Sequence, residues 1–296
     1  SSLNLKKYDS SGSKVNLRAN DIRGDQRYLA TNDGTDIIIL NQLFQGTTSI
    51  IGSRYAPSPI TISNNVTDPD HDIDFSAGVM EFDDGSGQAV ATALTKQLDA
   101  AWIAGDGNGG LFSGSIAIWY HCFAIYNPTT STYDAGYSTD IDAADIPAGY
   151  SKKERRGSIL TDGSGNILGF SQLGDTFTIN EPIVDRALSA LNGNITQSLS
   201  TPLGIKVIAK VIMRASTSNL GSDRFLLINS LSNDSLTASS SNFTDGIGGT
   251  TTSMTYERVH TEYAETNTSS QINAATSASM DTEIKTVGWR EPQLNR

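Results

Sequence analysis

Short apolar runs alternate with polar turns along most of the chain, a pattern typical of β-strands. Near the N-terminus, residues 26–31 and 35–41 flank an Asn32-Asp33-Gly34 turn and predict a hairpin. The longest apolar run, residues 115–126, is rich in β-branched and aromatic residues and predicts a long central strand. Further strands are expected at 72–75, 78–82, 133–137, 155–160, 167–170, 205–214, 224–228, 253–262, 269–273 and 284–289.

One segment departs from this pattern and predicts a helix over about residues 92–104. Thr92 can cap its start and Gly105 can end it, while apolar residues recur at a spacing of three to four: Leu94, Leu98, Ala101 and Trp102. This apolar stripe is expected to lie on a sheet. Residues 181–191 fit either a short helix or an irregular connection.

Small polar residues dominate the composition and favour the all-β interpretation. The chain of 296 residues contains 36 Ser, 30 Thr, 20 Asn and 27 Gly. These residues favour turns and strands over helix interiors, because their side chains compete for backbone hydrogen bonds or leave the backbone too free. The single cysteine, Cys122, excludes an internal disulfide framework. Neither a signal peptide nor a membrane span is evident, so we expect a soluble protein.

Prolines and a change in charge divide the chain into three predicted parts. Pro57 and Pro59 indicate an extended link, which places a boundary near residue 58. The sequence thus predicts an N-terminal attachment or oligomerisation segment, followed by two β-sandwich or jelly-roll-like domains, the first with one short helix. Their ranges are 1–58, 59–180 and 181–296.

The negative charge is concentrated in one segment. The whole chain carries a net charge of -11, whereas residues 61–150 hold thirteen acidic groups and one basic group, Lys96. This balance excludes a partner held mainly through phosphates, so no nucleic acid is expected. A basic cluster, Lys152 to Arg156, directly follows the acidic segment and predicts charge pairing within the domain or between copies; an anionic glycan site is the alternative.

Four acidic residues spaced two apart suggest an ion site. On a strand, Asp68, Asp70, Asp72 and Asp74 would share one face, and Asp83 and Asp84 could approach across a hairpin. A solvated acidic face explains the same pattern, and no run fits a twelve-residue calcium loop. Glycine-rich turns explain the segments 106–110 and 162–166. No metal or cofactor is therefore assigned, and the ion candidates kept are Asp72 and Asp74.

The sequence offers no motif for catalysis. The histidines are His71, His121 and His260, and none belongs to a zinc-type pair or a nucleophile elbow. His121 lies in the apolar run and fits a core or interface residue, whereas His71 stands between acids and fits a charged surface group. A carboxylate pair for glycoside cleavage is conceivable among so many acids, yet nothing singles one out. We therefore expect no enzyme and name no catalytic residue.

A series of motifs resembles a module of tailed-bacteriophage virion proteins of the tail fibre or receptor-binding type. The series runs in order over about residues 60–292: Asp72 to Gly78, Ala93 to Trp102, Gly109 to Leu111, Gly114-Ser115, Trp119 to His121, Pro147 to Tyr150, Arg155 to Ser158, Thr161 to Ile167, Thr201 to Val207, Asn267 to Ile272 and Gly288-Trp289. Each piece is short, and their order makes the resemblance specific.

The resemblance implies a structural protein on the exterior of a virion, assembled in the host cytoplasm. Such fibres are commonly homotrimers, so the chain is expected to bind itself, to attach to other virion proteins through residues 1–58, and to present β domains to a bacterial surface glycan or protein. The receptor-binding residues stay unknown, and no membrane insertion is expected. Alternatives are a head fibre, a decoration or tail-adaptor protein, and a glycan-degrading tail enzyme, although the repeats typical of that enzyme are missing.

Overall fold

The computed structural model consists of two compact units, residues 1–56 and residues 57–296. It describes residues 4–8, 14–16, 28–32, 36–42, 59–113, 118–217, 224–233, 237–247 and 256–292. The break between the units lies next to the predicted boundary at residue 58. Within the described residues the fold is all-β and sandwich-like, as the sequence predicts.

The N-terminal unit holds one four-stranded sheet in the order β2-β1-β4-β3. Its strands are β1 (Asn4–Tyr8), β2 (Lys14–Asn16), β3 (Tyr28–Asn32) and β4 (Asp36–Gln42). The predicted hairpin is confirmed, because β3 and β4 pair antiparallel, while β1 joins β4 in parallel. The tip of its predicted turn lies outside the described residues.

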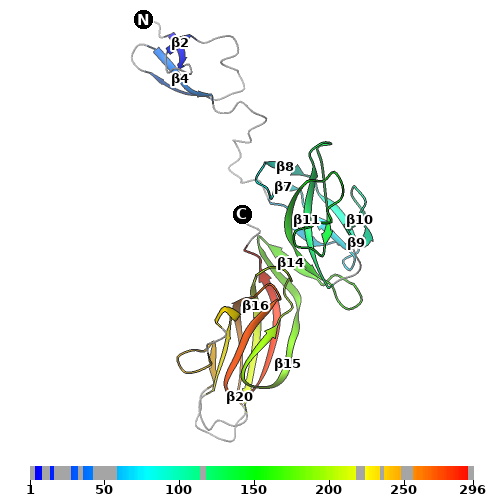
Figure 1. The fold of residues 1–296 in the computed structure, drawn as a ribbon, viewed down its shortest axis with the longest axis vertical. Helices are drawn as coiled ribbons and strands as arrows, with labels where there is room; N and C mark the ends of the chain where they lie inside the picture. The colour runs from blue at the N-terminus through cyan, green and yellow to red at the C-terminus, as the bar shows by residue number, and fades with distance from the viewer. Residues whose placement is uncertain are drawn as a thin grey trace. The chain divides into compact units, whose positions relative to one another are not determined.

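The second unit opens with a seven-stranded sheet in the order β13-β11-β12-β10-β9-β6-β5 (Figure 1). β11 pairs with both β13 and β12, which confirms the predicted central strand over its described residues. β7 and β8 form a separate antiparallel hairpin, which turns over residues 82–87. The bounds are β5 (Ile62–Asn64), β6 (Asp72–Phe75), β7 (Gly78–Glu81), β8 (Gln88–Ala91), β9 (Leu94–Ala101), β10 (Asn108–Leu111), β11 (Trp119–Asn127), β12 (Thr132–Ser138) and β13 (Lys152–Leu160).

A second seven-stranded sheet is built around two long strands that pair with each other, β15 (Thr176–Ser198) and β20 (Gln271–Arg290) (Figure 1). Segment 181–191, for which the sequence left two interpretations, therefore lies in strand β15. The predicted strands at 269–273 and 284–289 fall in the single long strand β20, which begins at Gln271. The remaining elements are β14 (Phe170–Leu173), β16 (Ile208–Thr217), β17 (Arg224–Asn229), β18 (Asp245–Ile247), β19 (Tyr256–Glu265) and a 3-10 turn, η1 (Leu231–Asn233).

The predicted helix over 92–104 is wrong, because this segment forms β9. Burial along β9 has the period of a strand: Leu94, Lys96 and Leu98 are buried and alternate with more exposed residues. Apolar residues four apart fit a strand as well as a helix, and the lysine between them concealed the alternation. Throughout the described ranges, no helix is long and apolar enough to cross a membrane.

The two large sheets share one core. Phe177 and Trp289 of the second sheet lie in the same buried cluster as Tyr120 of β11. The rings of Trp119 and Trp289 meet edge to face at 5.2 Å, and those of Phe177 and Trp289 stack at 5.5 Å. The domain boundary predicted after residue 180 falls inside β15, and the chain instead passes from the first sheet to the second over residues 161–169, between β13 and β14.

Candidate functional site

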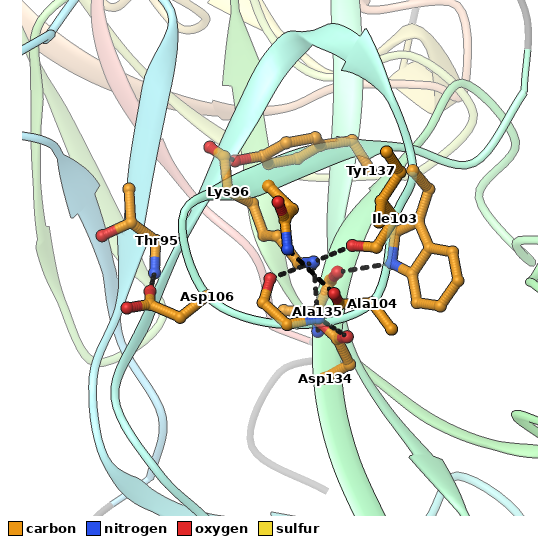
Figure 2. Close-up of polar contacts among 11 residues, drawn as sticks. Thr95, Lys96, Ile103, Ala104, Asp106, Asp134, Ala135 and Tyr137 are labelled. Carbon is orange, nitrogen blue, oxygen red and sulfur yellow. Dashed lines mark hydrogen bonds and ion pairs between the residues drawn. The ribbon is translucent and has the colours of Figure 1, made fainter.

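Lys96 of β9 lies at the centre of a group of polar contacts in the first large sheet (Figure 2). It is the single basic residue of segment 61–150, and its side chain is fully buried. Its Nζ lies 2.8 Å from Oδ1 of Asp134, a buried residue of β12. A charge withdrawn from water in this way is stable only when it is paired and hydrogen-bonded.

The Lys96 ammonium has an acceptor for each of its three N–H groups. Besides Asp134, Nζ donates to the carbonyl oxygens of Ile103 at 2.7 Å and Gly105 at 2.8 Å. It also lies 5.3 Å from the centre of the Trp102 ring, within the range of a cation–π interaction. We call Lys96, Trp102, Ile103, Gly105 and Asp134 the Lys96 site.

Asp134 also connects β12 to the loop between β9 and β10 through its second carboxylate oxygen. Its Oδ2 accepts a hydrogen bond from Gly105 N at 2.8 Å, and its Oδ1 accepts one from Ala135 N at 2.7 Å. Trp102 Nε1 donates to the Ala135 carbonyl at 3.0 Å. Figure 2 shows how these contacts converge on the connection between β9 and β10. The site therefore fixes the backbone of that connection.

The tip of this loop is a tight turn. Asp106 Oδ1 accepts a hydrogen bond from Thr95 N at 2.6 Å, and Gly107 N donates to the Thr95 carbonyl at 3.0 Å. Gly105 and Gly107 adopt φ values of +101° and +70°, which favour glycine. Ile103 is 61 % exposed, so the loop presents an apolar side chain outward on a fixed backbone.

Replacing the loop carboxylate is expected to loosen the turn. Asp106→Ala removes the acceptor of Thr95 N, and we expect a loss of about 1 kcal/mol in the free energy of unfolding because the site is exposed and water can replace the carboxylate. Urea unfolding followed by tryptophan fluorescence measures the change. Asp99→Ala, which removes an exposed acid of β9, is the control; an equal loss in both variants would contradict the role of Asp106.

The ion candidates Asp72 and Asp74 share one face of β6, as the spacing predicts, while the residues that alternate with them are buried. Asp74 Oδ1 accepts hydrogen bonds from Asn65 Nδ2 at 2.8 Å and Thr95 Oγ1 at 2.6 Å. Asp68 and Asp70 precede the strand, so the predicted row of four acids does not form. Nowhere in the described ranges do three His, Cys, Asp or Glu side chains gather in a group that could hold a metal.

Burial and neighbouring groups shift the pKa values of Asp72, His71 and Asp84. Burial, together with the charges of Asp68 and Asp99, raises the pKa of Asp72. A hydrogen bond to Asp68 at 3.0 Å raises the pKa of His71, which fits the predicted charged surface group. Asp84 does not approach β6: it pairs with Lys152, and this contact lowers its pKa. That pair is the predicted contact between the acidic segment and the basic cluster.

A second polar group lies where the two sheets meet. Nδ1 of His121 is hydrogen-bonded to Ser158 Oγ at 2.9 Å, and both residues are buried. Burial and the nearby Arg155 charge lower the pKa of His121 to about 4, so the imidazole is neutral. Arg155 pairs with the buried Glu291, which also accepts a hydrogen bond from Trp289 Nε1 at 2.9 Å.

This junction of His121, Ser158, Arg155, Glu291 and Trp289 joins the sheets rather than serving as a reaction centre. A serine and histidine in hydrogen-bond contact resemble a nucleophile and its base. Ser158 is 1 % exposed, however, so a substrate cannot reach its hydroxyl. The sequence placed His121 in the core or an interface, and the structure confirms this. The partners of His121 lie far from it in the chain, which is why sequence alone missed them.

Comparison of the chain with protein-family models, curated proteins and solved structures gives no match.

Proposed function

We propose that the chain is a structural component of a tailed-phage virion, a homotrimeric tail fibre or receptor-binding appendage. The ordered motif series over residues 60–292 is the observation that carries this proposal. Residues 1–58 attach the protein to the particle, and the β domains contact a glycan or protein of the bacterial surface.

The positions of the motifs in the fold support a structural role. The segment Ala93 to Trp102 forms β9 and begins the loop of the Lys96 site, and Gly109 to Leu111 lies in β10. Trp119 to His121 and Arg155 to Ser158 lie in β11 and β13, at the junction of the two sheets. The residues behind the resemblance thus build the framework of residues 57–296. A protein exposed outside a cell needs such internal contacts when it has no disulfide.

Labelling of intact particles tests this proposal. An antibody raised against the purified chain is expected to label the tail appendages of the phage that encodes it, visible in negative-stain images. Label on the capsid would instead assign the chain to head fibres or decoration proteins, and unlabelled particles would contradict a virion role. Release of reducing sugar from host capsule by the purified chain would favour a glycan-degrading enzyme.

The dependence of the molar mass on salt concentration distinguishes electrostatic from apolar association of the copies. If contacts between the acidic segment and basic groups hold the assembly together, 1 M salt is expected to dissociate it, because the Debye length falls to about 3 Å. Light scattering at low and high salt measures this. A molar mass that does not change with salt would indicate apolar packing between the copies.

A further inference from the structure

β19 is an edge strand of unusual regularity. Among the described strands it pairs only with β16, and the ten pairs from Ile208↔Glu265 to Thr217↔Tyr256 run without a register shift. The strand contains neither proline nor glycine. Such an edge presents a straight row of backbone donors and acceptors to another strand.

The opposite edge of the same sheet is built differently. Beyond its short pairing with β14, β15 forms an edge over residues 180–198, as far as the described residues show. It contains Pro182, and its pairing with β20 shifts register four times. Proline and bulges are the devices by which proteins prevent edge pairing. Proline and bulges thus occur in β15 and not in β19, which marks β19 as the edge suited to a partner whose charges complement its own.

Over residues 257–263 the side chains of β19 are exposed or partly exposed on both faces. Val259 and Tyr263, on one face, are 63 % and 59 % exposed. On the other face Arg258 and His260 are exposed, and Glu262 is partly exposed. Arg258 and Glu262 stand at equal distances in sequence on either side of His260. A strand with this arrangement of charges is complementary to its own antiparallel copy.

We propose that β19 pairs antiparallel with β19 of a second copy, about a twofold axis that places His260 opposite His260 of the second copy. This register places Arg258 of each copy opposite Glu262 of the other, giving two pairs of opposite charge, and Val259 opposite Thr261. Directly opposite side chains on one face of an antiparallel pair interact, and opposite charges there are favourable. The contact extends the sheet across both copies.

Charge selects this register over its neighbours. With a twofold axis perpendicular to the sheet, side chains on one face of β19 lie on the same face of the extended sheet in both copies. The registers that satisfy this condition differ from one another by steps of two residues. Centring the axis on Val259 places Arg258 opposite His260 and so loses both Arg258–Glu262 pairs, and centring it on Thr261 places Glu257 opposite Glu265. Centring it on Arg258 or Glu262 brings two like charges together. The register centred on His260 has no directly opposed like charges among residues 256–264.

Cysteine cross-linking tests the register in the full chain. Facing residues in an antiparallel pair have Cα atoms about 4.5–5.5 Å apart, within the range that a disulfide spans. His260→Cys is therefore expected to form a covalent dimer under mild oxidation. Glu265→Cys is the matched control, equally exposed but not facing itself. The native Cys122 is buried, and burial raises the pKa of its thiol, so it stays unreactive.

Charge reversal tests the source of specificity. Arg258→Glu, or Glu262→Arg, is expected to weaken association through β19 on the order of tenfold, and the double reversal to restore it. Sedimentation at several concentrations measures the association. Arg258 is exposed and Glu262 partly exposed, with Glu262 in contact with His260 Nε2 at 3.2 Å, so the melting temperature of each variant is measured alongside its association.

Three results would overturn the proposal: cross-linking at Glu265→Cys as efficient as at His260→Cys, preferential cross-linking at Val259→Cys or Thr261→Cys, and no rescue by the double reversal. The inference goes beyond the proposed function and fails independently of it. A twofold contact through β19 joins two monomers into a dimer, and it joins trimers to one another through the three β19 edges that each trimer carries. Loss of the trimer leaves the cross-link unaffected, and loss of the cross-link leaves the trimer unaffected.

Discussion

Asp134→Ala is expected to lower the free energy of unfolding of residues 57–296 by about 3–5 kcal/mol, because it leaves the Lys96 ammonium buried without a counter-charge. The variant also removes the acceptor of Gly105 N, so the loop between β9 and β10 loses its contact with β12. Urea unfolding monitored by tryptophan fluorescence reports on this region, since Trp102 lies in the Lys96 site.

A double variant shows whether the loss comes from the unpaired charge. Lys96→Met with Asp134→Leu removes both charges and keeps apolar volume, so we expect it to be clearly more stable than Asp134→Ala alone. If the double variant were as unstable as the single one, the loss would come from packing or from Gly105 N, and the ion pair would not be the reason.

Stability is expected to fall by about 3 kcal/mol as the pH drops from 6.5 to 4, because of His121. Its pKa in the folded protein is about 4, below the ordinary value of 6.5. Between these values the unfolded chain binds a proton that the folded protein does not, so acid favours unfolding. Well above pH 6.5 the imidazole is neutral in both states, and it contributes no pH dependence there.

The comparison with His121→Gln isolates this contribution. Burial raises the pKa of Asp185 and of Glu154, so these carboxyls bind protons more readily in the folded state and favour it as the pH falls. They are present in both proteins and cancel in the difference. Chemical unfolding at several pH values is expected to give curves that converge between pH 6.5 and 4; curves that stay parallel would contradict the effect of His121.

A strand of this fold is predictable from sequence where its own side-chain pattern determines it. It is not predictable where contacts with distant parts of the chain determine it. β11 was predictable because its residues are apolar and β-branched or aromatic on both faces, as a central strand requires. β20 was predicted as two strands because its middle, Ala274 to Met280, consists mainly of small residues that carry no strand pattern. β15 was undecidable because its register shifts break the alternation.

The Lys96 site was beyond prediction because its partners are distant in the chain. Nothing near Lys96 in sequence indicates Asp134, and the spacing of Leu94 and Leu98 on either side of it fits a helix as well as a strand. One signal was available: Lys96 is the single basic residue in a segment with thirteen acidic groups. A lone cation in such a segment is a candidate for a buried pair, and its position between Leu94 and Leu98 would then have indicated a strand.

The central claim, that this chain is a self-assembling structural protein, is tested most directly by the molar mass of the purified full chain in dilute solution. Sedimentation equilibrium at concentrations too low for the contact through β19 is expected to give three times the chain mass of 31.5 kDa. A mass equal to that of one chain at every concentration would contradict the account.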